Sequence, residues 1–195
     1  MRIVVASQNN GKLKEFKSVL EPLGYEVLSA RDLGVNLDDV VEDQDTFEGN
    51  ALIKARYLHE KTGLSVVSDD SGLCLEALPN ILGVYSARFM GEDTDYSIKN
   101  AEVLRLLEPY DNKNAAFHCV IAIVGDGFES TFSGKIEGLI KPLIGGQGGF
   151  GYDPIFFPHN EDGSFATLSL DVKNKISHRA QALQKLHQYL KEEQA

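Results

Sequence analysis

The sequence predicts an α/β fold: one mixed β-sheet flanked by helices, an arrangement that allows two lobes around a cleft. In the first half of the chain, short β-branched runs alternate with helical patterns, which is typical of a parallel sheet. In the second half, a hairpin pattern adds antiparallel strands. The 195 residues, 43% of them hydrophobic, contain no linker or repeat, so we expect a single domain over 1–195 without a marked boundary between lobes.

The first half alternates strand and helix. We predict strands over 3–6, 25–29 and 65–67, and helices over 13–20, 47–63 and 95–107. Asp45 and Glu48 are three residues apart and form a capping-box pattern at the start of the second helix. Gly24 and Gly63 are expected to end the first and second helices.

The second half changes character. The segments 117–124 and 128–133 flank Gly125-Asp126-Gly127 and read as a long hairpin, which 136–140 extends. The aromatic segment 150–157 reads as an interrupted strand. An amphipathic helix over 176–190 closes the chain, with Ser177 as a suitable N-cap.

Composition excludes several classes of function. The net charge of −10 argues against a nucleic-acid-binding protein, which usually has a basic face. No apolar run reaches membrane-spanning length, and the N-terminus lacks a secretory signal. Cys74 and Cys119 each lie in apolar runs, so we expect reduced, buried thiols in a cytoplasmic protein.

A polar turn follows the first predicted strand. Ser7, Gln8, Asn9, Asn10, Gly11 and Lys12 lie between that strand and a helix. Free backbone N–H groups at a helix start attract phosphate, and Lys12 adds a mobile cation. Taken alone, the segment is better explained as an ordinary polar turn that has Asn at the N-cap.

Acidic residues follow the third strand and precede the second helix. Asp69 and Asp70 are adjacent, so their side chains point in opposite directions on a strand. One of them can hold Mg²⁺ or accept a proton from water, although an acidic turn is an alternative. One carboxylate among Asp38, Asp39, Glu42, Asp43 and Asp45 can complete a metal site with Asp70, although most of these residues are expected to be solvated surface charges. Lys54 can reach a phosphate or extend along the apolar stripe of its helix.

The glycine-rich segment Gly145–Gly149 runs into Phe150, Gly151, Tyr152, Asp153 and Pro154. It contains a formal G-x-G-x-x-G, but that fingerprint must open a helix, and Pro154 with the following aromatic residues indicates extended chain. A loop whose backbone approaches a flat ligand, with Phe150 or Tyr152 stacking on a base, fits better. Packed aromatics in a hairpin loop remain the alternative.

Basic residues gather at the last helix. Lys173 precedes it, and Ser177 would place His178 and Arg179 in the first turn. These side chains can donate hydrogen bonds to a carbonyl or a phosphate, although by themselves they form only a charged helix start.

The order of these segments resembles the inosine triphosphate pyrophosphatase family from Ile3 to about Leu190. The matching motifs are Ser7-x-Asn9-x-x-Lys12, Thr46-Phe47 through Asn50-Ala51 and Lys54-Ala55, Ser68 to Leu73, Tyr85-Ser86-Ala87-Arg88, Gly148 to Pro154, and Ile176-Ser177-His178-Arg179. The glycine-loop and Ser-His-Arg motifs are specific enough to make chance agreement improbable.

This resemblance implies Mg²⁺-dependent hydrolysis of ITP, dITP and XTP to the monophosphate and pyrophosphate. It also implies a homodimer and an elongated mixed β-sheet flanked by helices, with two lobes around a central substrate cleft. Asp70 would be the general base and a metal ligand, with Glu42 as the second metal carboxylate and Asp43 as the alternative to Glu42. The implied substrate-binding residues are Ser7, Gln8, Asn9, Asn10, Gly11, Lys12, Lys54, Ser71, Phe150, Gly151, Tyr152, Asp153, Lys173, His178 and Arg179. Ser7 and Gln8 stand where family members often have Thr and Gly; the hydroxyl is retained.

Two other classes of function stay open at this point. One is a different phosphohydrolase that uses the same carboxylates and lysines on another nucleotide or releases single phosphates. The other is a catalytically silent purine-nucleotide sensor. The presence of Asp70, Glu42 and Lys12 argues against the sensor.

Overall fold

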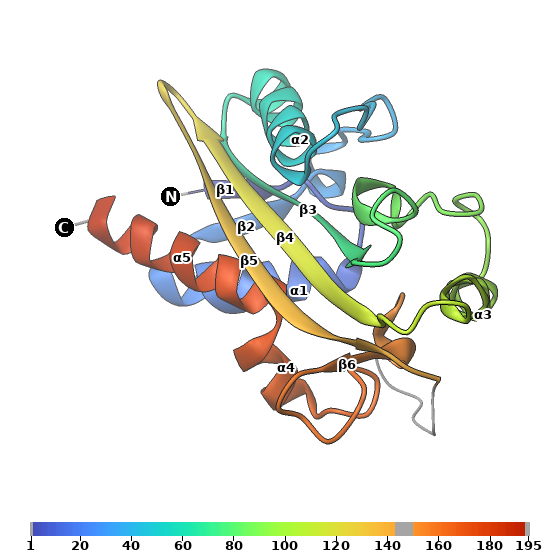
Figure 1. The fold of residues 1–195 in the computed structure, drawn as a ribbon. Helices are drawn as coiled ribbons and strands as arrows, with labels where there is room; N and C mark the ends of the chain where they lie inside the picture. The colour runs from blue at the N-terminus through green and yellow to red at the C-terminus, as the bar shows by residue number, and fades with distance from the viewer. Residues whose placement is uncertain (1, 143–149, 194–195) are drawn as a thin grey trace. The chain divides into compact units, whose positions relative to one another are not determined.

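The computed structural model in Figure 1 describes residues 2–142 and 150–193. Its strands are β1 (Arg2–Val5), β2 (Glu26–Ser29), β3 (Ser65–Leu75), β4 (Asn114–Gly125), β5 (Phe128–Ile140) and β6 (Phe156–Pro158). Its α-helices are α1 (Asn10–Leu20), α2 (Phe47–Thr62), α3 (Tyr96–Leu107), α4 (Leu170–Ile176) and α5 (His178–Glu193). Short 3₁₀ helices are η1 (Glu21–Leu23), η2 (Arg31–Leu33), η3 (Gly83–Tyr85) and η4 (Asp153–Ile155).

The strands form a mixed sheet in the order β2-β1-β3-β4-β5-β6. β1 pairs in parallel with β2 and β3, whereas β5 pairs antiparallel with β6. Only Asp126 and Gly127 separate β4 from β5, and Gly127 has a φ of 77°, which a tight hairpin turn favours. The predicted mixed sheet and hairpin are therefore confirmed.

The chain divides into two compact units. Unit 1 comprises 1–70, 119–134 and 181–195, and unit 2 comprises 71–118 and 135–180. Strands β3, β4 and β5 therefore contribute residues to both units. The single domain and the cleft between two lobes stay predictions.

Unit 1 buries apolar side chains on both faces of its part of the sheet. Figure 1 shows α1 and α5 on one side of β1 and α2 on the other. The first core lies under α1 and α5 and includes Phe16, Leu20 and Leu186, all fully buried. The second lies under α2 and includes Ala51, Ala55 and Leu58. The helical spacing of these residues is what buries one stripe of each helix.

Unit 2 has its own core around β6 and the part of β4 that belongs to this unit. Phe117, Phe156 and Phe165 pack together, with Phe117 and Phe156 edge to face at 4.8 Å between ring centroids. Leu107 and Val103 of α3 belong to the same core. Phe156 and Phe165, almost fully buried, anchor the segment that follows Phe150.

Two predicted helix starts need correction. The N-cap of α2 is Thr46, whose Oγ1 accepts from Gly49 N at 3.0 Å, and not Asp45. The predicted helix over 176–190 is two helices, because Ser177 has extended backbone angles and its Oγ caps Ala180 N at 3.1 Å. Ser177 is thus an N-cap, as predicted, but Ile176 ends α4.

Strand β3 is longer than the predicted 65–67, since it continues through Asp69 and Asp70 to Leu75. Polar residues rarely extend a buried strand, but here each of the three polar side chains has a polar partner. The hydroxyl of Ser68 donates to the Ala51 carbonyl, and Asp69 and Asp70 are bound as described below. Tertiary contacts therefore override the local turn pattern.

Candidate active site

The turn after β1 starts α1 in the way the sequence predicts. Asn9 has extended backbone angles, and its Oδ1 accepts from Gly11 N at 2.8 Å and from Lys12 N at 3.2 Å. The Ser7 hydroxyl accepts from Asn9 N at 3.2 Å. The side chains of this turn therefore satisfy part of the helix start, and the same turn carries the predicted phosphate-binding residues.

Asp69 and Asp70 point to opposite faces of β3, and each has its own partners. Asp69 is 1% exposed, and its Oδ2 lies 2.9 Å from the Lys12 ammonium. Asp70 accepts from the Asn50 amide, with 3.1 Å between Nδ2 and Oδ2. The two neighbouring carboxylates thus belong to different clusters of unit 1.

Burial raises the pKa of the Asp70 carboxyl above its ordinary value. The charge of Lys54 opposes this shift and that of Glu42 reinforces it, while the Asn50 hydrogen bond and Lys12 lower the pKa. Lys54 in turn pairs with Glu42 at 3.0 Å between Nζ and Oε2. Asp70, Glu42 and Lys54 therefore form one electrostatically coupled cluster.

The alternative metal carboxylate, Asp43, has a different environment. It is exposed, and its Oδ1 accepts from the side chain of its neighbour Gln44 at 2.8 Å. Within residues 2–142 and 150–193, no group of three or more His, Cys, Asp or Glu side chains is arranged to hold a metal ion.

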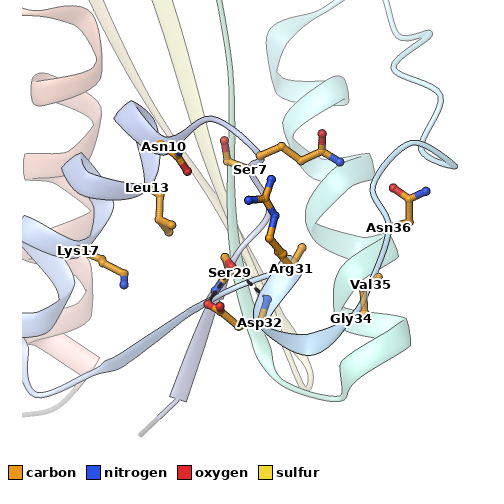
Figure 2. A pocket seen from close by; sticks show the side chains of 12 residues that line it. Ser7, Asn10, Leu13, Lys17, Ser29, Arg31, Asp32, Gly34, Val35 and Asn36 are labelled. Carbon is orange, nitrogen blue, oxygen red and sulfur yellow. Dashed lines mark hydrogen bonds between the residues drawn. The ribbon is translucent and has the colours of Figure 1, made fainter.

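A pocket of about 470 Å³ opens beside the turn that follows β1 (Figure 2). Figure 2 shows the Arg31 side chain extending toward Ser7. Asp32 is already bound, because its Oδ2 accepts from both N and Oγ of Ser29 at 2.8 Å, which lowers the pKa of Asp32. The remaining lining residues are Gln8, Asn10, Leu13, Lys17, Ala30, Gly34, Val35 and Asn36. Two cations and one hydrogen-bonded carboxylate give the lining a net positive charge.

Unit 2 holds the aromatic segment that follows the glycine-rich stretch. Gly145–Gly149 fall outside the described residues, whereas Phe150–Asp153 are described. Asp153 is buried, and its Oδ2 accepts from Phe150 N at 2.9 Å and from the Lys173 ammonium at 2.7 Å. The Lys173 ammonium also lies 5.6 Å from the centroid of the Phe150 ring. With 51% of its surface exposed, Phe150 presents a ring that a flat ligand can reach.

The first turn of α5 is buried in unit 2. His178 stacks on Phe117 with 4.9 Å between ring centroids, and Arg179 donates to the Ser71 hydroxyl at 3.1 Å. Both residues are less than a tenth exposed. Their positions are therefore fixed by packing, and the predicted residues Ser71 and Arg179 are brought together although 108 positions separate them.

Two further residues of unit 1, Asn50 and Asp69, bind predicted site residues although the sequence gives neither of them a role. Asn50 is fully buried and connects Asp70 to Gln44, whose backbone N donates to Asn50 Oδ1 at 3.0 Å. Asp69 holds Lys12. Asn50 and Lys54 are spaced so that they share one helix face, and this spacing is a sequence signal that Asn50 lies near the site. No local pattern identifies Lys12 as the partner of Asp69.

Both cysteines are free thiols, and Cys119 is buried as expected. Cys74 is only half-buried, so the expectation of a buried thiol is wrong there. Across the described ranges, no helix combines the length and apolar character needed to cross a membrane.

Comparisons with known proteins place these features in a family. The sequence pattern of the Ham1 family matches residues 3–189. A dITP/XTP pyrophosphatase of Thermoanaerobacter sp. (strain X514) is 46% identical over 97% of this chain and 96% of its own length, and one of Bacillus subtilis (strain 168) is 42% identical over 96% of each. The structure of the Staphylococcus aureus Ham1 protein has a TM-score of 0.90 at 36% identity, covering 99% of this chain and all of the other. The resemblance predicted from the motifs is confirmed: the chain belongs to the Ham1 family.

Proposed function

We propose that this protein hydrolyses non-standard purine nucleoside triphosphates, such as dITP, ITP and XTP, to the monophosphate and pyrophosphate, and so cleanses the nucleotide pool. Its relatives are named dITP/XTP pyrophosphatases and match it over nearly the whole chain. The observation that carries the proposal is the cluster of unit 1, in which a buried carboxylate of raised pKa lies among a second carboxylate and lysines. Such clusters are typical of sites that transfer phosphoryl or nucleotidyl groups.

Asp70 is the proposed general base. It accepts a proton from water while the water oxygen bonds to the α-phosphorus, and the bond from that phosphorus to the bridging oxygen breaks. Pyrophosphate leaves with the electron pair of the broken bond. Desolvation makes the carboxylate a stronger base, and the Asn50 amide holds one of its oxygens in place.

Lys12 and Lys54 are the proposed electrostatic partners of the phosphates. Each is mostly buried and already paired with a carboxylate, Asp69 and Glu42 respectively. An ammonium group held in this way keeps further N–H donors for phosphate oxygens and stabilises the charge that develops on the leaving group. The turn over 7–11 adds backbone N–H groups and hydroxyl and amide side chains.

Magnesium is the proposed metal, and the residues present fit it. Mg²⁺ prefers one or two carboxylates together with substrate phosphates, and Asp70 and Glu42 are close enough to be coupled. When bound, the ion supplies Lewis-acid polarisation of phosphate oxygens and makes a coordinated water more acidic. The chain's contribution is to present the two carboxylates, with Lys54 fixing Glu42.

Unit 2 is proposed to recognise the base. Phe150 offers a stacking surface, and Lys173 and Arg179 are the cations held by Asp153 and Ser71. Donors at Arg179 or His178 would pair with a 6-oxo group and leave a 6-amino group unmatched, which can produce large discrimination against ATP. A homodimer is proposed on the resemblance alone. A cytoplasmic location and the lack of nucleic-acid or membrane partners are proposed from the charge, the cysteines and the hydropathy of the sequence.

The test is to measure pyrophosphate and phosphate released from dITP, ITP, XTP, GTP and ATP with Mg²⁺ present or absent. Pyrophosphate from the first three with little from GTP and ATP is the expected result. Phosphate as the product would favour a different phosphohydrolase, and binding without turnover would favour a nucleotide sensor.

A further inference from the structure

Helix α3 contacts the proposed base-recognition segment from within unit 2 through Asn100. The Asn100 amide Nδ2 donates to the Gly151 carbonyl at 3.1 Å. Gly151 has a φ of 64°, a left-handed conformation, so the direction of its carbonyl is set by a turn that few residues adopt. The Asn100 side chain therefore holds this turn through the backbone carbonyl of Gly151.

The same Asn100 side chain is incompletely satisfied. It is 7% exposed, and within the described residues its Oδ1 has no hydrogen-bond partner. A buried acceptor without a partner costs free energy, so an apolar residue would serve a purely structural role at least as well. The amide is therefore best explained by its one bond, the bond to Gly151.

Lys99, the neighbour of Asn100, is equally unusual. It is fully buried, and its ammonium donates to the Ala87 carbonyl at 2.6 Å and lies 4.8 Å from the centroid of the Tyr96 ring. Among the residues that the structure describes, no carboxylate pairs with it. A buried cation without a carboxylate is expensive, which again points to a role beyond stability.

The Ala87 carbonyl belongs to the Tyr85-Ser86-Ala87-Arg88 motif, and this motif leads back to the same loop. The hydroxyl of Tyr152 donates to the Ser86 carbonyl at 2.7 Å. The rings of Tyr152 and Tyr96 meet edge to face at 5.3 Å between centroids. The consecutive α3 residues Lys99 and Asn100 thus bind the carbonyls of Ala87 and Gly151 respectively. Tyr152, which follows Gly151, binds the carbonyl of Ser86, which precedes Ala87.

We propose that Asn100 and Lys99 are positioning residues for base recognition: they hold Gly151 and Tyr152, and thereby set where the exposed Phe150 ring meets the base. This inference rests on the proposed function, because it presupposes that Phe150 contacts a purine. It also gives the Tyr85–Arg88 motif a task, which is to accept hydrogen bonds from Lys99 and Tyr152.

Steady-state kinetics with dITP test the proposal through Asn100→Ala. The KM should rise about fivefold, the change expected from losing one neutral hydrogen bond, while kcat stays within about twofold. Asn100→Asp, which has the same size but cannot donate when ionised, should raise KM at least as much. A split between KM and kcat is required because Asp70, in unit 1, performs the chemical step.

The matched control is Val103→Ala. Val103 is fully buried on the same helix and packs in the core of unit 2, so its truncation destabilises α3 without touching Gly151. It should lower the melting temperature and leave the KM for dITP unchanged. If Val103→Ala raised KM as much as Asn100→Ala, the effect would be one of stability and the inference would be overturned.

A second readout does not depend on turnover. The chain contains no tryptophan, so Phe150→Trp introduces a single reporter in the loop. Adding Asn100→Ala to this variant should shift the emission to the red and speed quenching by acrylamide, whereas adding Val103→Ala should do neither. Unchanged emission and KM in an active Asn100→Ala protein would refute the positioning role alone, whereas a wild-type protein that releases no pyrophosphate from dITP would refute the proposed function.

Discussion

Replacing Asp69 with asparagine tests how the neighbouring carboxylates of β3 divide their tasks. Asp69 is 1% exposed and Lys12 19% exposed, with 2.9 Å between Oδ2 and Nζ. Removing one partner of a buried ion pair costs about 3 to 5 kcal/mol, because the other charge stays buried without compensation. Since Lys12 keeps some contact with water, we expect the lower end, about 3 kcal/mol.

The assay is denaturant unfolding followed by far-ultraviolet circular dichroism, without Mg²⁺ or nucleotide. For a chain of this length, a loss of about 3 kcal/mol lowers the melting temperature by roughly 6 to 12 °C. Asparagine is nearly isosteric with aspartate, so no cavity contributes to the loss. Combining Asp69→Asn with Lys12→Met should cost less than the sum of the two single changes, since both charges are then absent.

The matched control is an ion pair of the same length on the surface. Arg2 and Glu26 are also 2.9 Å apart, but their side chains are 61% and 58% exposed. Glu26→Gln should therefore cost about 0.5 kcal/mol or less, because solvent screens both charges. Equal losses for Asp69→Asn and Glu26→Gln would refute the argument from burial.

Four further predictions concern Asp70, Arg179 and Cys74. Because burial raises the pKa of Asp70, its ionised form opposes folding above that raised pKa, and the shift has no effect on stability below the ordinary value of 3.8. Without Mg²⁺ at pH 7, Asp70→Asn should therefore melt at a higher temperature than the wild type. This difference in melting temperature should vanish as the pH falls below 3.8. The same variant should lose at least about 10²-fold in pyrophosphate release, and wild-type turnover would disprove the base assignment. Arg179→Ala should raise the KM for ITP about tenfold and narrow the gap to ATP; unchanged selectivity measured in parallel assays would count against its role. Burial raises the pKa of the Cys74 thiol, so labelling by a disulfide reagent should be slow at pH 7 and accelerate with pH, and rapid labelling at pH 7 would contradict this environment.

Local patterns in the sequence identified most secondary structure correctly, because the contacts that start a helix or form a tight turn lie within a few residues of one another. Asn9 and Ser177 cap helices with their own side chains, and a two-residue turn determines the β4–β5 hairpin. The length of strand β3 was predicted wrongly because the partners of two of its side chains are distant in the sequence. Asp69 and Asp70 read locally as the end of a strand, but their partners lie in α1 and α2 and allow β3 to continue.

The sequence is enough to propose which residues form the site, but it does not show which of them contact one another. Alternation along a strand determines that Asp69 and Asp70 face opposite ways, and the resemblance to the family implies the proposed role of Asp70 as the base. Only the tertiary structure decides that Lys12 meets Asp69, that Asn50 binds Asp70, and that Arg179 reaches Ser71. The physical reason is that a period of two or 3.6 residues specifies which face a side chain occupies, whereas the packing of elements far apart in the chain specifies what lies opposite that face.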